Sequence, residues 1–346
     1  MSANEFHLLY TRHRSSGEPS KRQLTMMIRK IKTTFEGIIP IDVDYCVSLV
    51  PVPTRSTIVQ INCHRSVMHV DIVNHVSSMT NRPTADFMHN HVIIGNVDVV
   101  ATRSAIVKRS AAGNIVFSHF MVNHYFISVI HGIVFSIDYL RRVVAVDNDN
   151  VLHEVDTDVS IIQTYCSLQR NCFVYLKDRD LISVHIRGNE LIKKVLRSKG
   201  PELQPIKNQV FQSLELLSDG RIAIGYVVDI LPSSDKSIAI ENKILIIDER
   251  YPKIPLSWSD SVIGLRHMHR IVPLRWHSMK CDLIMVHCAQ SYASLLVCTK
   301  SCLVTLSSFH TDPAQGNDTM IWTESKKHLK ILLLTSRSLH VLSIKF

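Results

Sequence analysis

The stretch CFVYLKDRDLISVHI, residues 172–186, consists of two short apolar runs on either side of the charged segment KDRD at 177–180. Runs of about four to eight residues rich in β-branched and aromatic side chains are typical of β-strands. A polar hinge of this length between two such runs predicts an antiparallel hairpin. The fold depends on whether this hairpin occurs once or is one copy of a repeated unit.

The same hairpin spacing recurs along the chain. Counted from the first apolar residue of one run to the first of the next, Phe173 and Leu181 are eight residues apart. Four other pairs have the same separation: Val59 and Val67, Val143 and Val151, Leu295 and Leu303, and Ile331 and Leu339. Local hairpins of one size, spread over the chain without interleaved helices, predict radially repeated β-sheets.

Larger units of four strands can be traced around these hairpins. Residues 160–195 contain four apolar runs, SIIQTYCSL, CFVYL, LISVHI and ELIKKV, and a second unit begins at Val210. The last unit, TMIWTE, KILLLTS and LHVLSIKF, has three runs before the sequence ends. Because an unpaired strand edge invites aggregation, we expect an N-terminal strand near residues 42–50 to pair with this unit and close the ring.

On these repeats the chain resembles the WD40-like β-propeller class, with six or seven blades over residues 42–346. The resemblance is architectural, because the sequence contains no Gly-His or Trp-Asp dipeptide and its three tryptophans are not at equivalent places. It implies an all-β fold used as a platform for other proteins. A pair of β-sandwiches is the alternative fold.

The first 35 residues differ from the rest. Residues 1–20 are polar and without periodicity, which predicts a flexible tail. Residues 21–35 are predicted to form a basic amphipathic helix, because apolar residues recur there at helical spacing. The helix is interpreted either as packing on the protein's own sheets, or as lying in a partner's groove, or as serving membrane-surface binding or nuclear import. The residues predicted to bind a partner are Leu24, Met27, Ile28, Arg29, Lys30 and Ile31.

Composition indicates a globular protein whose charge is unevenly distributed. Of the 346 residues, 46% are hydrophobic, and residues 1–35 carry seven Lys or Arg and two Glu, a net +5 of the chain's +9. The eight cysteines lack C-x-x-C spacing and indicate a reducing compartment. No apolar run is long enough to predict a membrane span. We therefore expect an intracellular protein, nuclear or cytoplasmic, while the basic N-terminus also leaves a mitochondrial location open.

No stretch of the sequence indicates catalysis. The nucleophile elbow G-x-S-x-G and the glycine-rich phosphate loops are absent. The histidine pairs HNH at 89–91 and HMH at 267–269 have no third ligand at a familiar zinc spacing. The aspartates at 147, 149, 178 and 180 lie on hinges, where Asp favours turns. We predict no catalytic residue, metal, cofactor or small-molecule substrate, and hence not an enzyme.

One basic segment provides an alternative function. Residues 264–280, GLRHMHRIVPLRWHSMK, combine four Arg or Lys with Trp276 and contain no acid. Basic side chains beside an aromatic ring can neutralise phosphates and stack on a base. The contacts predicted for RNA or DNA are Arg266, Arg270, Arg275 and Trp276.

The leading functional hypothesis is a non-enzymatic interaction scaffold, a subunit of a larger intracellular complex whose partners are other protein subunits. The alternative is a subunit that binds RNA or chromatin through its basic patches.

Overall fold

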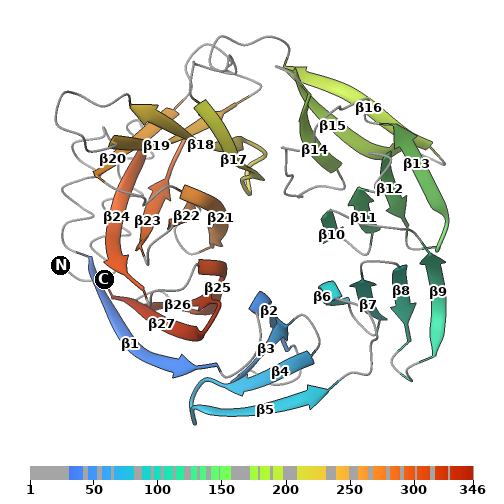
Figure 1. Cartoon of the computed structure of the whole chain (residues 1–346), viewed down its shortest axis with the longest axis horizontal. Helices are drawn as coiled ribbons and strands as arrows, with labels where there is room; N and C mark the ends of the chain where they lie inside the picture. Colours follow the sequence, from blue (N-terminus) through green and yellow to red (C-terminus); the bar gives the residue numbers. More distant parts are fainter. Residues whose placement is uncertain are drawn as a thin grey trace. The chain divides into compact units, whose positions relative to one another are not determined.

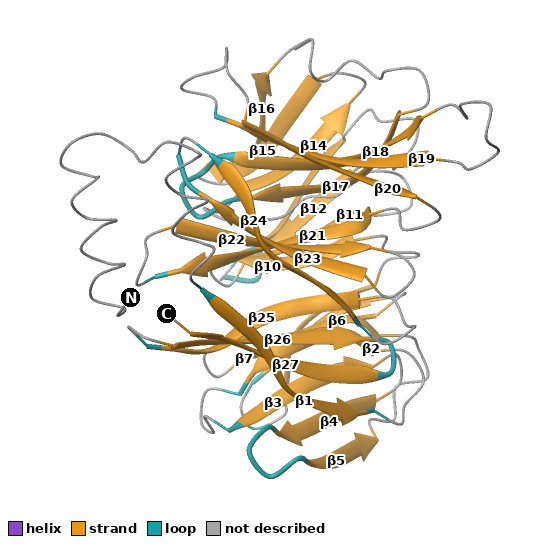
Figure 2. Cartoon of the chain, turned by 90° about the vertical axis from the view of Figure 1, so that its left-hand side faces the viewer, coloured by secondary structure: helices purple, strands orange, loops and turns teal. Residues whose placement is uncertain are grey.

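The computed structural model of the protein is all-β in the part of the chain that it describes. The described residues form twenty-seven strands and no helix (Figure 2), and so include no helix that could cross a membrane. The described residues are 31–41, 46–52, 57–63, 66–81, 88–94, 97–102, 105–110, 112, 114–120, 126–130, 133–137, 142–147, 149–156, 172–177, 180–187, 190–197, 209–230, 239–248, 256–263, 268–277, 281–288, 292–300, 302–311, 316–325 and 328–345.

The chain divides into two compact units. Unit 1 comprises Met1–Asp42 and Pro205–Phe346, and unit 2 comprises Val43–Gln204. The described strands form three antiparallel sheets in unit 1 and four in unit 2 (Figure 1), and every sheet except one has four strands. Seven sheets agree with the upper of the two predicted blade counts.

Unit 2 contains four sheets whose strands follow chain order. The first is β2 (Cys46–Pro51), β3 (Ile58–Cys63), β4 (Ser66–Asp71) and β5 (Val76–Asn81). The second is β6 (Met88–Ile94), β7 (Val97–Thr102), β8 (Ala105–Arg109) and β9 (Ile115–Phe120). The third is β10 (Phe126–Ile130), β11 (Ile133–Ile137), β12 (Arg142–Val146) and β13 (Leu152–Asp156). The fourth has three described strands, β14 (Cys172–Lys177), β15 (Asp180–Arg187) and β16 (Glu190–Arg197).

Unit 1 contains the other three sheets. Two follow chain order: β17 (Gln209–Leu216), β18 (Ile222–Ile230), β19 (Ala239–Ile247) and β20 (Leu256–Ile263), then β21 (Met268–Trp276), β22 (Cys281–Cys288), β23 (Tyr292–Cys298) and β24 (Leu303–His310). The last joins both ends of the described chain, in the order β1 (Lys32–Pro40), β27 (Ser338–Lys345), β26 (His328–Thr335) and β25 (Gly316–Glu324). Figure 1 shows blue β1 beside red β27.

The hairpins predicted from the eight-residue spacing are confirmed. β14 and β15 pair from Cys172↔His185 to Lys177↔Asp180, so KDRD is the hinge of an antiparallel hairpin. The other four spaced pairs fall on the hairpins β3–β4, β12–β13, β23–β24 and β26–β27. The run predicted to precede β14, residues 160–168, lies outside the described residues.

Two N-terminal predictions need correction. The helix expected over 21–35 does not extend to its predicted end, because residues 32–35 belong to β1; residues 1–30 lie outside the described part. The strand that pairs with the last unit is β1, and not a strand at 42–50, since β2 begins the next sheet. The segment KTTFEGIIP of β1 has no strict alternation, because a β-bulge between Phe35 and Gly37 shifts its register.

Sheets stacked face to face bury both sides of the inner strands of unit 1. All eight residues of β22 are buried. Leu283 and Met285 point into an apolar cluster shared with β26 and β27, whereas Ile284 and Val286 point into a second cluster shared with β18 and β19. Since successive side chains of a strand point to opposite faces, a sheet covered on both faces needs a continuous apolar run. This explains why polar and apolar residues do not alternate in the segment CDLIMVHC of β22.

Candidate interaction surfaces

The N-terminal residues predicted to bind a partner are described only at Ile31. Leu24, Met27, Ile28, Arg29 and Lys30 lie outside the described residues. Ile31 is partly buried and packs against the apolar cluster between the last two sheets of unit 1. Its contacts are therefore with the protein's own core.

The described residues of the basic segment predicted to contact nucleic acid do not form one surface. Trp276 is 1% exposed at the end of β21, so it cannot stack on a base, and the prediction for this residue is wrong. Arg270 and Arg275 are five residues apart on the same strand and therefore lie on opposite faces. The guanidinium of Arg270 lies 3.9 Å from the Asp318 carboxylate, and that of Arg275 lies 3.9 Å from the Asp282 carboxylate. Arg266 lies outside the described residues. The aromatic-basic arrangement that motivated the hypothesis is thus not assembled.

Arg275 instead belongs to a buried ionic cluster between the first two sheets of unit 1. Asp282 is 1% exposed, and its Oδ2 accepts a hydrogen bond from the Ser218 N–H at 3.2 Å. Arg275 Nη1 hydrogen-bonds Ser218 Oγ. Burial raises the pKa of Asp282, and the charge of Asp219 adds to this, while the Ser218 bonds and Arg275 offset part of it.

Arg221 joins the same two sheets. The side chain is 4% exposed; its Nε donates to Asp219 Oδ2 at 2.8 Å and its Nη1 to the Thr299 carbonyl at 2.6 Å. The nearby thiol of Cys298 is buried, and burial raises its pKa to about 12. A thiol with this pKa stays protonated at neutral pH and is a poor nucleophile. The cluster therefore links two sheets by buried ionic hydrogen bonds and does not have the properties of a catalytic centre. We call such a link between neighbouring elements a latch.

A second latch lies in unit 2. Lys108, 4% exposed on β8, donates from Nζ to the Asp147 carbonyl at 2.6 Å in the β12–β13 turn. Asp147 Oδ1 accepts the N–H of Asp149 at 3.0 Å and of Val151 at 2.8 Å, and Oδ2 contacts His153 Nε2 at 2.8 Å. Asp147 thus organises the turn, as predicted for a hinge aspartate.

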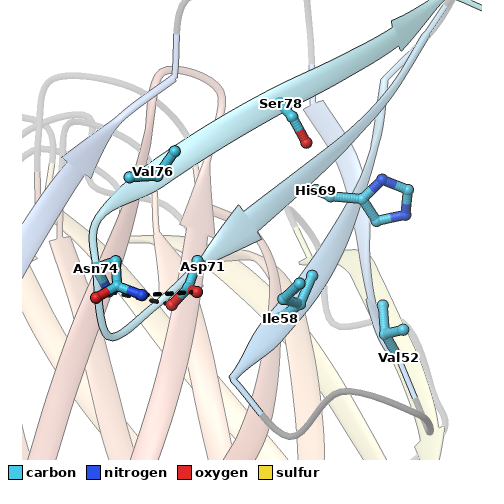
Figure 3. Close-up of a pocket in the computed structure, with 7 residues that line it drawn as sticks. All are labelled: Val52, Ile58, His69, Asp71, Asn74, Val76 and Ser78. Atoms are coloured by element: carbon cyan, nitrogen blue, oxygen red, sulfur yellow. Dashed lines mark hydrogen bonds between the residues drawn. The ribbon is translucent and has the colours of Figure 1, made fainter.

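The first sheet of unit 2 has a groove of about 710 Å³ on one face. Successive strands contribute its lining, as Figure 3 shows: Val52, Ile58, His69, Asp71, Asn74, Val76 and Ser78. Ile58, Asp71 and Val76 lie side by side on β3, β4 and β5 and form one cross-strand row. His69 of β4 and Ser78 of β5 are paired in the neighbouring row on the same face, together with Gln60 of β3. Asp71 thus lies between two apolar side chains, Ile58 and Val76, and the neighbouring row is polar. Its size is within the range of ligand and peptide sites.

The neighbouring Ser78, His69 and Asp71 do not form a catalytic triad. A triad requires a carboxylate that orients the histidine. Asp71 instead caps the β4–β5 turn: Oδ1 accepts the N–H groups of Val73 at 2.9 Å and Asn74 at 3.1 Å, and Oδ2 accepts Asn74 Nδ2 at 3.0 Å. The groove is therefore better suited to binding than to nucleophilic catalysis.

Large apolar side chains are exposed on two outer strands of unit 2 and the turn before one of them. Val73, Val76 and Met79 of the β4–β5 hairpin are 53–61% exposed, and Ile115, Val116 and Phe120 of β9 are 48–79% exposed. Neither β5 nor β9 contains a charged residue. The sequence does not single out these residues, because an apolar run does not reveal whether its strand lies inside a sheet or at its edge.

No group of three potential metal ligands occurs among the described residues. The side chains of the predicted pairs His89/His91 and His267/His269 lie outside the described part.

Comparisons with known proteins identify the fold but no family. No protein-family model matches the sequence, and no curated protein matches it. Among solved structures, the chain is similar to the N-terminal domain of Nup159, with a TM-score of 0.63 and 11% identity over 91% of this chain and 96% of that one.

Two further structures have the same architecture. A chain of the Mitotic Checkpoint Complex has a TM-score of 0.59 and 9% identity, covering 92% of this chain and 94% of that one. A streptogramin B lyase has a TM-score of 0.56 and 10% identity, covering 91% and 98%. These neighbours are β-propellers, so the predicted all-β propeller class is confirmed and the sandwich alternative is rejected. At these identities the likeness establishes the fold alone.

Proposed function

We propose that the protein is a non-enzymatic interaction scaffold, a subunit of a larger intracellular assembly in the nucleus or cytoplasm. The observation that carries this proposal is the exposure of large apolar side chains on the charge-free strands β5 and β9 of unit 2. Exposed apolar surface of this kind marks sites of protein interaction. Similarity to a chain of the Mitotic Checkpoint Complex, an assembly by its name, supports the same conclusion.

The chemistry of the described residues supports a role without catalysis. The titratable clusters around Arg221 and Asp147 join neighbouring elements of the fold, and Asp147 also accepts hydrogen bonds from the backbone of its own turn. Burial raises the pKa of the Cys281 and Cys298 thiols, so both are protonated at neutral pH. The lyase among the structural neighbours shows that the fold can carry an enzyme, so this part of the proposal rests on the sites and not on the fold.

The nucleic-acid hypothesis has less support. Arg270 and Arg275 both lie beside carboxylates, and Trp276 is buried. Binding through phosphates would weaken steeply with salt. We expect no complex with RNA or DNA in a mobility-shift titration of the full chain at low salt. Partner binding by Leu24, Met27, Ile28, Arg29 and Lys30 of the N-terminal segment stays a prediction.

The proposal is tested by measuring the mass of the tagged full chain after gentle lysis and gel filtration. We expect elution in a particle well above the 39.3 kDa of the chain, with other proteins in fixed ratio by quantitative mass spectrometry. A chain that elutes at its own mass, with no protein in fixed ratio, would contradict the scaffold function.

A further inference from the structure

The outer strands of the sheets differ in how their free edges are protected. We take as the outer strand the last strand of each sheet in chain order, and β1 in the sheet that joins both ends of the described chain: β5, β9, β13, β16, β20, β24 and β1. Native sheets protect such edges with charges, prolines or bulges, because unpaired backbone groups can pair with another chain. A strand without these devices is therefore open to pairing.

β5 is the one described outer strand that has none of these devices. All six of its residues pair with β4 in unbroken register, from Ser66↔Asn81 to Asp71↔Val76. Its sequence, VSSMTN, contains no charge and no proline. By contrast, the pairings of β1, β9, β16 and β24 contain register shifts, and β13 and β20 carry acidic residues.

The groove adjoins this open edge. Val76 and Ser78 of β5 line it, and they lie two residues apart on one face of the strand. A strand added beside β5 would place every second side chain on that same face, next to Val76 and Ser78. The open edge and the groove thus fit the backbone and the side chains of one extended ligand.

The charge of the groove indicates which side chains the ligand should carry. Between residues 57 and 81 the sequence has two charged side chains besides histidine: Arg65, which lies outside the described residues, and Asp71, which lines the groove. The carboxylate of Asp71 is ionised at neutral pH, because the backbone bond from Asn74 and the other turn bonds lower its pKa. Asp71 lies one strand inside β5, so an added strand would be about 10 Å away across two strand spacings. The long side chains of Lys and Arg can cross much of this distance.

We propose that β5 accepts an extended peptide segment of a partner protein as a fifth strand of the first sheet of unit 2. Alternate side chains of the segment lie on the groove side: an apolar residue packs on Val76, and a Lys or Arg reaches toward Asp71. This inference rests on the proposed scaffold function and assigns it a site and a ligand class. No group of the ligand is chemically changed.

The probe is a displayed library of random twelve-residue peptides, selected on the purified full chain. The recovered peptides are expected to alternate apolar and polar residues and to contain Lys or Arg. Synthetic copies are then titrated by fluorescence polarisation against Val76→Lys and against Val195→Lys. Val195 is the matched control, because it is 53% exposed on another outer strand, compared with 60% for Val76. We expect at least a tenfold loss of affinity for Val76→Lys and no change for Val195→Lys.

Asp71→Asn separates the charge from the turn, because Asn retains an oxygen that can cap it. At low salt this variant should bind the peptides about fivefold more weakly, as for an exposed charge pair, and its affinity should no longer depend on salt. Strand pairing is tested on the peptide itself. Two versions of each peptide are compared, one methylated at the odd-numbered backbone nitrogens and one at the even-numbered ones. Because only alternate N–H groups of an added strand face β5, one version should lose binding and the other should bind as the unmodified peptide does.

Hydrogen exchange provides a measurement that does not depend on the stability of the variants. The amides of residues 76–81 should exchange more slowly in the wild-type chain when a selected peptide is bound. The proposal is overturned if no recovered peptide separates the wild type from Val76→Lys, if both methylation patterns bind equally, or if exchange at 76–81 is unchanged. Peptides that bind both chains equally would keep the scaffold function and remove this site. An isolated chain in gel filtration would remove the scaffold function as well.

Discussion

Arg221→Met tests the latch between the first two sheets of unit 1. The substitution keeps much of the apolar side-chain volume and removes the guanidinium, which donates to Asp219 at 2.8 Å and to the Thr299 carbonyl at 2.6 Å. Hydrogen bonds to charged groups contribute about 1.5–3 kcal/mol each, and removal of one partner of a buried pair costs about 3–5 kcal/mol. Asp219 is 24% exposed and can be rehydrated, which places the expected loss at about 3–4 kcal/mol.

Lys243→Met is the matched control. Lys243 also contacts a carboxylate two residues away on the chain, Glu241, at 2.8 Å, but its side chain is 29% exposed compared with 4% for Arg221. Because solvent screens such a pair, we expect a loss below about 1 kcal/mol. The two variants thus differ in burial and in the bond from Arg221 to the Thr299 carbonyl.

Tryptophan fluorescence during urea unfolding is the appropriate assay, because all three tryptophans, 258, 276 and 322, belong to unit 1. For a unit of this size, the expected loss in Arg221→Met corresponds to a melting temperature lower by about 10 °C. Equal losses in both variants, or a loss below about 1 kcal/mol in Arg221→Met, would refute the assignment of Arg221 as a buried latch.

Three further variants test packing and buried charge. Gly225→Ala would place a Cβ 2.8 Å from the Met268 terminal methyl carbon, which is fully buried; we expect a loss of about 1–3 kcal/mol, and calorimetry should show that Met268→Ala costs less in this background than alone. For Asp282, whose folded pKa is raised, stability is lost as pH rises above the ordinary Asp range. Asp282→Asn should therefore gain in urea midpoint relative to the wild type from about pH 4 to pH 7, and a constant difference would contradict this. For Asp147 the folded pKa is lowered, because the His153 and backbone bonds outweigh the effect of burial, so its stabilisation is present at neutral pH and is lost as pH falls through the folded pKa. Asp147→Asn should thus be less stable than the wild type at pH 7 by circular dichroism, with a difference that shrinks in acid.

The repeating hairpins could be predicted from the sequence because their cause is local. An apolar run, a polar hinge and a second run eight residues on are sufficient to specify β14–β15 and β26–β27. The sequence also indicated that the last unit needs another strand. It did not indicate β1, because KTTFEGIIP contains a bulge and its apolar residues follow no strict alternation.

The binding surface could not be predicted in the same way. Trp276 and the arginines around it form a conspicuous segment, yet burial of the indole and the nearby carboxylates depend on packing between distant strands. The run VSSMTN of β5 contains no motif at all. Its importance depends on three facts of the folded chain: the strand is at an edge, its register is unbroken, and it borders a groove.

The scaffold function is tested most directly by comparing the proteins that co-purify with three forms of the tagged chain. The first is the wild type, the second carries Met79→Lys and Phe120→Lys on the exposed strands of unit 2, and the third carries His310→Lys and Thr323→Lys at exposed positions of unit 1. Quantitative mass spectrometry, with melting temperatures as a control for folding, should show partners in fixed ratio with the wild type and the third form, and their loss from the second. The same partners at the same ratio in all three forms would contradict the account.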